Sequence, residues 1–340
     1  SSSAATHWPQ SPFEDPAVLS GICEKVVFPN ILLRDSDVEL FEDNCSEYVR
    51  RDMEGADQET RRRSSMDLVK AMGRLNEAKV TEILIGYVKV LMEQARQVPP
   101  DKAERFKDAC IFLCIAMAVR GQTQREGVTV TNANINIVDF FTSLVVPELT
   151  SEPISQRSLL RASCLKFVTV FRNQLPREQI GAILPAICRH ITSESAVVHT
   201  YAGICIEKLL SVRDKTPQGL SVLRYDPASM RSSLLQMVEP ILQIIAANKG
   251  IEMNEYLMRT VARIFAFLKQ QGAETGLATL RPLAAILVAM SANPSNPVFN
   301  HNLFEAIASI VKICVPTQPD AVEAALLPAF GQILEKNVTD

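Results

Sequence analysis

The sequence predicts an all-α protein in which antiparallel helix pairs stack into an α-solenoid of about six and a half HEAT-type repeats. Aromatic residues make up only 6% of the 340 residues and there are 13 glycines, whereas strands and their turns would need more of both. Prolines recur within apolar helical runs at intervals of 38 to 55 residues, at Pro147, Pro185, Pro240, Pro282 and Pro328. A second amphipathic segment follows each run except the last, so the period fits that of a two-helix repeat.

The elements are assigned from these runs in chain order. Residues 1–15 are rich in Ser and Pro and are predicted to be disordered, and residues 16–340 are predicted to form one array. The repeats are expected at residues 16–76, 77–120, 133–173, 177–214, 227–270 and 275–316, with a half repeat at 320–336. Polar stretches at 120–136 and 211–229 are expected to be connections. The final helix has no partner, so we expect the chain to be part of a longer array.

The first repeat carries an insertion at residues 34–58, between the two helices of the pair. Six carboxylates and no Lys or Arg lie between Asp35 and Glu47, and basic clusters follow at Arg50–Arg51 and Arg61–Arg63. A connection of this length is expected to be either disordered or functional.

Local patterns favour an ordered insertion with one or two short helices. Ser36 with Glu39 has the form of a capping box, and Asn44 with Glu47 is a close variant. An apolar stripe recurs at helical spacing, and Gly55 suits a helix end. The stripe consists of Val38, Phe41, Cys45, Val49 and Met53. We expect this stripe to dock on the solenoid and the acidic face to stay in water.

Several function classes lack their sequence signature. The net charge of −3 comes with no basic stripe for nucleic acid, and the longest uncharged apolar run, Ala109–Val119, is too short to span a bilayer. The eight cysteines show no zinc spacing and are expected to be free thiols in a reducing compartment. Phosphate-loop, hydrolase and metalloprotease motifs are absent, and His190, His199 and His301 are expected to be structural. The sequence therefore predicts no catalytic residue, cofactor or metal.

Three interpretations of the acidic segment remain open at this point. The segment could be a solvated surface, or it could be an electrostatic docking patch for a basic partner. The third interpretation is that Arg61–Ser64, which follow it, form a site for a basophilic kinase. The kinase site ranks below the docking patch because the arginines lie at the start of a predicted helix.

Four stretches of this chain resemble the importin-α export receptors of the importin-β superfamily, in the same order along the chain. These stretches are VVFPNILLRDSDVELFEDNCSEYVRRDMEGADQETRRR (26–63), FRNQLPREQI (171–180), VVHTYAGICIEKLL (197–210) and NPSNPVFNHNLFEA (293–306). The likeness runs from about Gly21 to Asp340, and Cys45 stands where this superfamily usually has Pro. The resemblance implies a monomeric HEAT superhelix that shuttles between nucleus and cytoplasm, binds importin-α together with the GTP form of the small GTPase Ran, and performs no catalysis.

By the same resemblance, the insertion contributes to partner binding. The residues expected to contact Ran or importin-α are Arg34, Asp35, Asp37, Glu39, Glu42, Asp43, Glu47, Arg50, Arg51, Asp52 and Glu54. The alternatives are another importin-β-type receptor with a different cargo, or a HEAT scaffold unrelated to transport.

Overall fold

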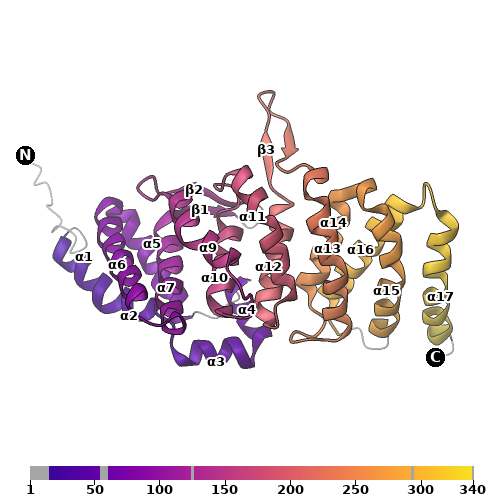
Figure 1. Ribbon diagram of the computed structural model, residues 1–340, viewed down its shortest axis with the longest axis horizontal. Coiled ribbons are helices and arrows are strands. Elements are labelled where there is room, and N and C mark those ends of the chain that lie inside the picture. Colours follow the sequence, from indigo (N-terminus) through magenta and orange to yellow (C-terminus); the bar gives the residue numbers. More distant parts are fainter. Residues whose placement is uncertain (1–14, 54–59, 124–125, 292–294, 339–340) are drawn as a thin grey trace, which may run out of the picture.

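The computed structural model describes residues 15–53, 60–123, 126–291 and 295–338. It is an elongated array of helix pairs that runs from α1 at one end to α17 at the other (Figure 1). The predicted all-α solenoid is therefore confirmed. The predicted disordered segment and Gly55 lie outside the described residues, except for Asp15, which caps α1.

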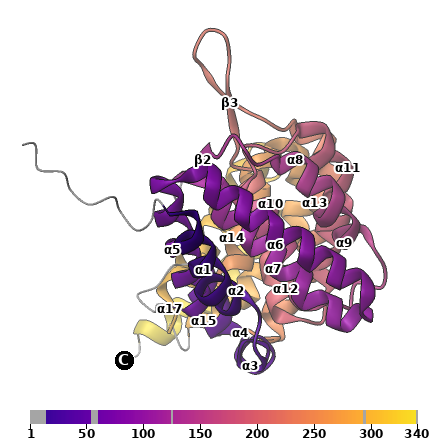
Figure 2. The same cartoon turned by 90° about the vertical axis from the view of Figure 1, so that its left-hand side faces the viewer.

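Each pair has a first and a second helix, and the second helices pack on one another in chain order. We call this the second-helix layer. It consists of α5 (Arg61–Leu75), α7 (Pro100–Ala118), α10 (Ser158–Val170), α12 (Ala196–Leu209), α14 (Glu255–Leu268) and α16 (Pro297–Cys314). The unbroken first helices are α6 (Glu77–Gln97), α11 (Arg177–Arg189), α13 (Pro227–Ala246), α15 (Ala273–Ser291) and α17 (Pro319–Val338). Figure 2 shows α6, α9, α11 and α13 together on one side of the array.

Two first helices contain a π-helical turn immediately before a proline. One is α1 (Pro16–Ile22), η2 (Cys23–Val27) and α2 (Phe28–Ile31), and the other is α8 (Ile137–Phe140), η3 (Phe141–Val145) and α9 (Val146–Thr150). The N–H groups of Phe28 and Val146 each donate to a carbonyl five residues back, and a proline follows directly in both helices. Because proline cannot donate and its ring crowds the preceding turn, the wider turn accommodates it within a continuous helix.

The other prolines of the periodic set, Pro185, Pro240, Pro282 and Pro328, lie inside regular α-helices. None of these four side chains is buried. Each ring therefore interrupts the helix on a side that the core does not require for packing.

The two polar connections contain β-hairpins that the sequence analysis did not predict. Strands β1 (Val119–Thr123) and β2 (Gly127–Thr131) pair antiparallel after α7, and β3 (Arg213–Lys215) and β4 (Ser221–Leu223) pair after α12. The β3–β4 hairpin projects from the array, as both views show (Figures 1 and 2). The run Gly-Val-Thr-Val-Thr in β2 carries the β-branched residues typical of strands, so a local signal was present.

Polar side chains cap the helices of the array at their first turns. For example, Asn296 Oδ1 accepts from the N–H of Phe299 at 3.0 Å at the start of α16. The same arrangement occurs at Asn76, Ser195, Asp226 and Asn254. These residues satisfy donors that a helix start leaves free, which fixes where each helix begins.

Two stretches reach the hydropathy of a membrane span, Pro16–Asp43 and Glu255–Ser291, with mean values of 1.4 and 1.3. Each stretch is divided among several helices of the array. The first stretch ends with α3 (Asp35–Asp43), and the second ends with α15. Their apolar side chains contribute to the common core, for example Leu19, Ile264 and Leu283.

Candidate functional site

The insertion forms two short helices, α3 (Asp35–Asp43) and α4 (Cys45–Met53). Asn44 Oδ1 accepts from the N–H of Glu47 at 3.2 Å, so the predicted cap at Asn44 is confirmed. The predicted cap at Ser36 is wrong, because α3 begins at Asp35 and Ser36 therefore lies inside the helix. There the Arg34 N–H donates to Asp37 Oδ2 at 2.8 Å, so a carboxylate inside the first turn takes the capping role.

The apolar stripe of the insertion is docked, as predicted. Phe41 and Val49 are buried, and Val38 and Cys45 are half-buried. The rings of Phe41 and Tyr48 meet edge to face with centroids 5.1 Å apart, which joins α3 to α4. The side chain of Met53 lies outside the described residues.

The C-terminal end of α4 reaches helices more than one hundred residues further along the chain. The Asp52 carboxylate accepts hydrogen bonds from Lys166 Nζ on α10 and from the Tyr201 hydroxyl on α12. Burial and the neighbouring Asp52 charge raise the pKa of Tyr201 well above its usual value, so its hydroxyl stays protonated and donates. The insertion of the first repeat is thus fixed to the third and fourth repeats.

Helices α10 and α12 are buried on nearly all sides. Every residue from Leu159 to Thr169 is buried except Lys166, and every residue from Ala196 to Glu207 is buried. Apolar residues occur on every side of both helices, with Arg161, Lys166 and Glu207 as charged exceptions, and this composition is typical of a helix covered on most faces. This pattern was the one sequence signal that something lies over these two helices.

The basic cluster that follows the insertion has a structural role at its first two positions. Arg61 donates to the carbonyls of Asn30 at 2.6 Å and Leu32 at 3.0 Å, where α2 ends, and to Asp37 Oδ2 at 2.6 Å, where α3 begins. One guanidinium therefore holds the corner between the first helix and the insertion. These hydrogen bonds disfavour the kinase-site interpretation, because they occupy the Arg61 guanidinium that a basophilic kinase would have to bind.

Arg62 connects the corner to the core. It is 8% exposed, donates to the Ile31 carbonyl at 2.8 Å, pairs with the buried Asp108, and lies 3.6 Å from the ring centroid of Phe112. Ser163 Oγ donates to the other oxygen of Asp108 at 2.5 Å. Burial raises the pKa of Asp108, and the Arg62 charge and these hydrogen bonds oppose that rise. The network joins α5, α7 and α10 beneath the insertion.

The sequence-predicted contact residues divide into three groups. Exposed members are Arg34, Asp35, Glu39, Glu42, Asp43 and Arg50. Half-buried members with intramolecular partners are Asp37, Glu47, Arg51 and Asp52. Glu54 lies outside the described residues. The expectation that the carboxylates stay in water therefore fails for Asp37, Glu47 and Asp52, because each has a basic partner within the insertion or the array.

The four carboxylates of the first group, Asp35, Glu39, Glu42 and Asp43, form an acidic surface on α3. Asp35 pairs with Arg105 at 2.6 Å and is 82% exposed. Within the part of the chain that the structure describes, the carboxylates of Glu39, Glu42 and Asp43 make no hydrogen bond or ion pair. On α4, hydrogen bonds from Arg51 and Arg50 lower the pKa of Glu47. Glu39, Glu42 and Asp43 are thus the carboxylates available to a partner.

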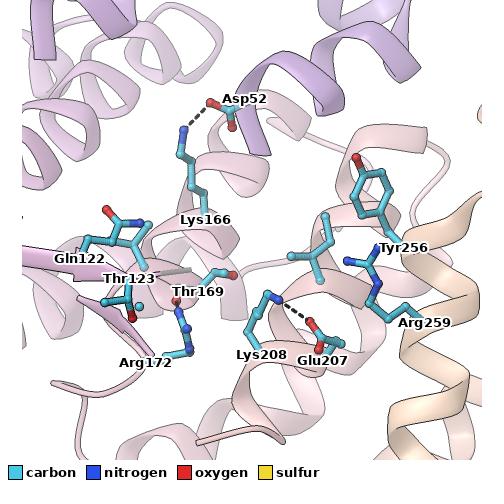
Figure 3. Close-up of a pocket in the computed structure, with 13 residues that line it drawn as sticks. Asp52, Gln122, Thr123, Lys166, Thr169, Arg172, Glu207, Lys208, Tyr256 and Arg259 are labelled. Carbon is cyan, nitrogen blue, oxygen red and sulfur yellow. Dashed lines mark hydrogen bonds and ion pairs between the residues drawn. The ribbon is translucent and has the colours of Figure 1, made fainter. Parts of the chain in front are cut away.

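A cavity of about 390 Å³ lies beside Asp52 on the second-helix layer (Figure 3). The Asp52–Lys166 pair stands at one end and the Lys208–Glu207 pair, 3.0 Å apart, at another. Arg259 and Tyr256 from α14 border it on the side away from the β1–β2 hairpin.

Histidine and cysteine supply no reactive group in this region. His190 and His199 are buried, and burial lowers the pKa of each to about 4. All eight cysteines are free thiols, as predicted, and burial raises the pKa of Cys110 to about 12. Among residues 15–53, 60–123, 126–291 and 295–338, no cluster of three His, Cys, Asp or Glu could hold a metal ion.

Comparison with known proteins identifies relatives along the whole chain. A family model described as Cse1 matches residues 1–206, and one described as the C-terminus of CAS/CSE proteins matches residues 207–340. Exportin-2 of Bos taurus is 37% identical and Exportin-2 of Homo sapiens 36% identical, each over 339 residues that cover 96% of this chain and 34% of the relative. The chain therefore spans about a third of the length of these relatives.

A solved structure of the exportin Cse1 in its cargo-free, cytoplasmic state has a similar fold. It is 33% identical in sequence and superposes with a TM-score of 0.80. The match covers 95% of this chain and 33% of that protein.

Proposed function

This chain belongs to the Cse1/CAS family, and a similar solved structure is that of the exportin Cse1. We propose that the chain is the central segment of a nuclear export receptor. The receptor returns importin-α to the cytoplasm in a complex with the GTP form of Ran, and it shuttles through nuclear pores. It acts by protein binding, without catalysis, cofactor or metal. The observation that carries this proposal is the match of family, relatives and fold along nearly the whole chain.

We further propose that α3 presents the insertion's contact with Ran or importin-α. Glu39, Glu42 and Asp43 support this role because they are exposed, close in sequence and free of partners among the described residues. Their helix is held rigidly by the Phe41–Tyr48 contact and by Arg61. A fixed carboxylate surface steers a basic partner and suppresses an acidic one.

The assembly of the full-length receptor tests the function. Immobilised receptor is incubated with importin-α, with and without GTP-loaded Ran, and the captured protein is quantified. We expect capture of importin-α to require Ran-GTP. Equal capture without Ran would contradict the proposal.

A charge reversal tests the contribution of the insertion. The triple variant Glu39→Lys, Glu42→Lys and Asp43→Lys should weaken assembly about tenfold at physiological salt, because exposed charge pairs contribute up to about 1 kcal/mol each. The matched control reverses Glu82, Glu93 and Glu178, which are exposed on first helices away from the insertion. An equal loss in both triple variants, or no loss in the first, removes the docking role of α3.

A further inference from the structure

Two cavities adjoin each other on the second-helix layer. The first is the cavity of about 390 Å³ described above, here called the hairpin cavity. The second, of about 340 Å³, lies between the insertion and helices α5 and α7 and is called the insertion cavity. Both are lined by Asp52, Gln122, Lys166 and Val170. They are therefore two compartments of one groove, separated by the Asp52–Lys166 ion pair.

The hairpin cavity presents cations to solvent. Its lining contains Lys166, Arg172, Lys208 and Arg259, against the carboxylates of Asp52 and Glu207. Lys208 and Arg259 are the more exposed of these cations, at 31% and 35%, whereas Arg172 is buried and the Glu207 side chain is only 6% exposed. Arg259 also has a long ion pair with Glu255 of its own helix, at 3.9 Å. Figure 3 shows Lys208 and Arg259 approaching the cavity from two different helices. A ligand that enters this compartment thus meets positive charge first.

The insertion cavity has a different chemical character. Its wall combines an apolar and aromatic part with charged side chains such as Arg51, Arg62 and Asp37. The apolar part consists of Leu40, Tyr48, Met66, Phe112, Ile115, Val119 and Val170. At its rim, Arg63 and Lys70 share the single carboxylate of Asp67, at 4.0 and 3.0 Å. The compartment therefore offers an apolar surface with a surplus of positive charge at the opening.

The charge of the groove is opposite to that of its surroundings. The chain carries a net charge of −3, and the outer surface of α3 above the groove is acidic. A partner for the groove must therefore differ in charge from the basic partner that suits α3. Each compartment is near the lower limit of about 300–1,000 Å³ for small-ligand pockets, so it accepts side chains and not a folded domain.

We propose that this groove binds an acidic peptide segment in an extended conformation. Carboxylates of the peptide pair with Lys208 and Arg259 in the hairpin cavity, and an apolar side chain of the same segment enters the insertion cavity beside Tyr48 and Phe112. This inference goes beyond the proposed export function, because it concerns a second surface and a partner of opposite charge.

The test measures binding of a defined probe to the full-length receptor. The probe is a fluorescein-labelled peptide with four consecutive Glu residues followed by Gly, Leu and Phe, and the readout is fluorescence anisotropy. We expect affinity to fall as salt is raised from about 50 to 300 mM, since exposed ion pairs are screened. Replacing the four Glu by Gln, or Leu and Phe by Ser, should also reduce the affinity.

Variants of the receptor locate the binding site. The double variant Lys208→Glu and Arg259→Glu should bind the probe about tenfold more weakly, because two attractions become two repulsions. The matched control is Lys89→Glu with Arg281→Glu, which makes the same charge change on exposed positions of α6 and α15. Leu40→Glu, at the insertion cavity, should also weaken binding of the acidic probe.

Several outcomes would overturn the inference. These are full affinity in the Lys208/Arg259 variant, an equal loss in the control, no effect of the peptide's Leu and Phe, or equal displacement of the probe by a single-stranded oligonucleotide. If the double variant does not fold, as judged by circular dichroism, the salt dependence and the altered peptides still decide the question. Ran-GTP-dependent capture of importin-α by the same variants is scored separately, so failure here is distinguishable from failure of the export function.

Discussion

Replacement of Asp52 by Ala should release α4 from the second-helix layer while the rest of the array stays intact. Asp52 is the acceptor for both Lys166 and Tyr201, which come from two different repeats. Without it, the ammonium group loses its counter-ion and the buried phenol loses its acceptor.

The magnitude follows from the burial of the pair. Loss of one partner costs about 3–5 kcal/mol for a fully buried ion pair and about 0–1 kcal/mol for an exposed one. The Asp52 and Lys166 side chains are 19% and 13% exposed, which places this pair at about 2 kcal/mol. The unsatisfied Tyr201 hydroxyl adds about 1 kcal/mol. The total of about 3 kcal/mol corresponds to roughly a hundredfold change in the equilibrium for detachment of α4.

Hydrogen exchange followed by mass spectrometry measures this local equilibrium directly. Peptides that cover residues 45–53 should lose about a hundredfold in protection, whereas peptides from α14 and α16 should be unchanged. Tyr201→Phe keeps the ion pair and should lose only about fivefold, from a cost of about 1 kcal/mol. Asp43→Asn is the matched control, because Asp43 is exposed on the same insertion and has no partner among the described residues. Unchanged protection of α4 in Asp52→Ala, or a loss spread evenly over the array, would refute the role assigned to Asp52.

Two further predictions concern the stability of the array. Gly127→Ala should lower the free energy of unfolding by about 2–3 kcal/mol, because φ is +78° and a Cβ would lie 2.3 Å from Nη1 of Arg172, which is buried and donates to the Thr169 carbonyl. Gly219→Ala, at φ +80° with open space around it, should cost only about 1 kcal/mol, and equal losses in urea titrations would refute the steric argument. Stability should also decrease as the pH falls from about 6.5 towards 4, because the folded-state pKa of His190 and of His199 is about 4, below the ordinary value of 6.5. Above pH 6.5 both states are neutral and this penalty is absent. At pH 5 it should reach about 2 kcal/mol per histidine, and a urea midpoint that does not change between pH 7 and pH 5 would contradict it.

The helix pairs were predictable because their information is local. The position of a helix is indicated by apolar residues at helical spacing, without reference to distant residues. Capping residues such as Asn44 and Asn296 and prolines such as Pro185 add to this local information. The docked stripe of the insertion was predictable for the same reason. The residue at the N-cap of α3 was not predictable in this way. Arg34 precedes Asp37 by three positions and Ser36 precedes Glu39 by three positions, so only the backbone geometry distinguishes the two candidates.

The role of the insertion's charges was only partly predictable. The high apolar content of α10 and α12 indicates that both helices are covered, yet it does not identify the segment that covers them. The arginine cluster looked like a surface feature, whereas Arg61 and Arg62 hold the corner between α2, α3 and the core. The groove and its positive lining arise from helices that are distant in sequence, so no short stretch carries its signature.

The sequence by itself determined the helical repeat, the insertion and its amphipathic helical character, because each depends on side chains within one or two turns of one another. That the insertion forms two helices came from the structure. Only the tertiary structure decided which carboxylates face water. Asp52 and Asp43 belong to the same insertion, but the partner of Asp52 lies 114 residues away on α10. The superhelical stacking brings Lys166 and Tyr201 beneath α4, and the low polarity of that contact favours a paired carboxylate there, while Asp43 stays in water.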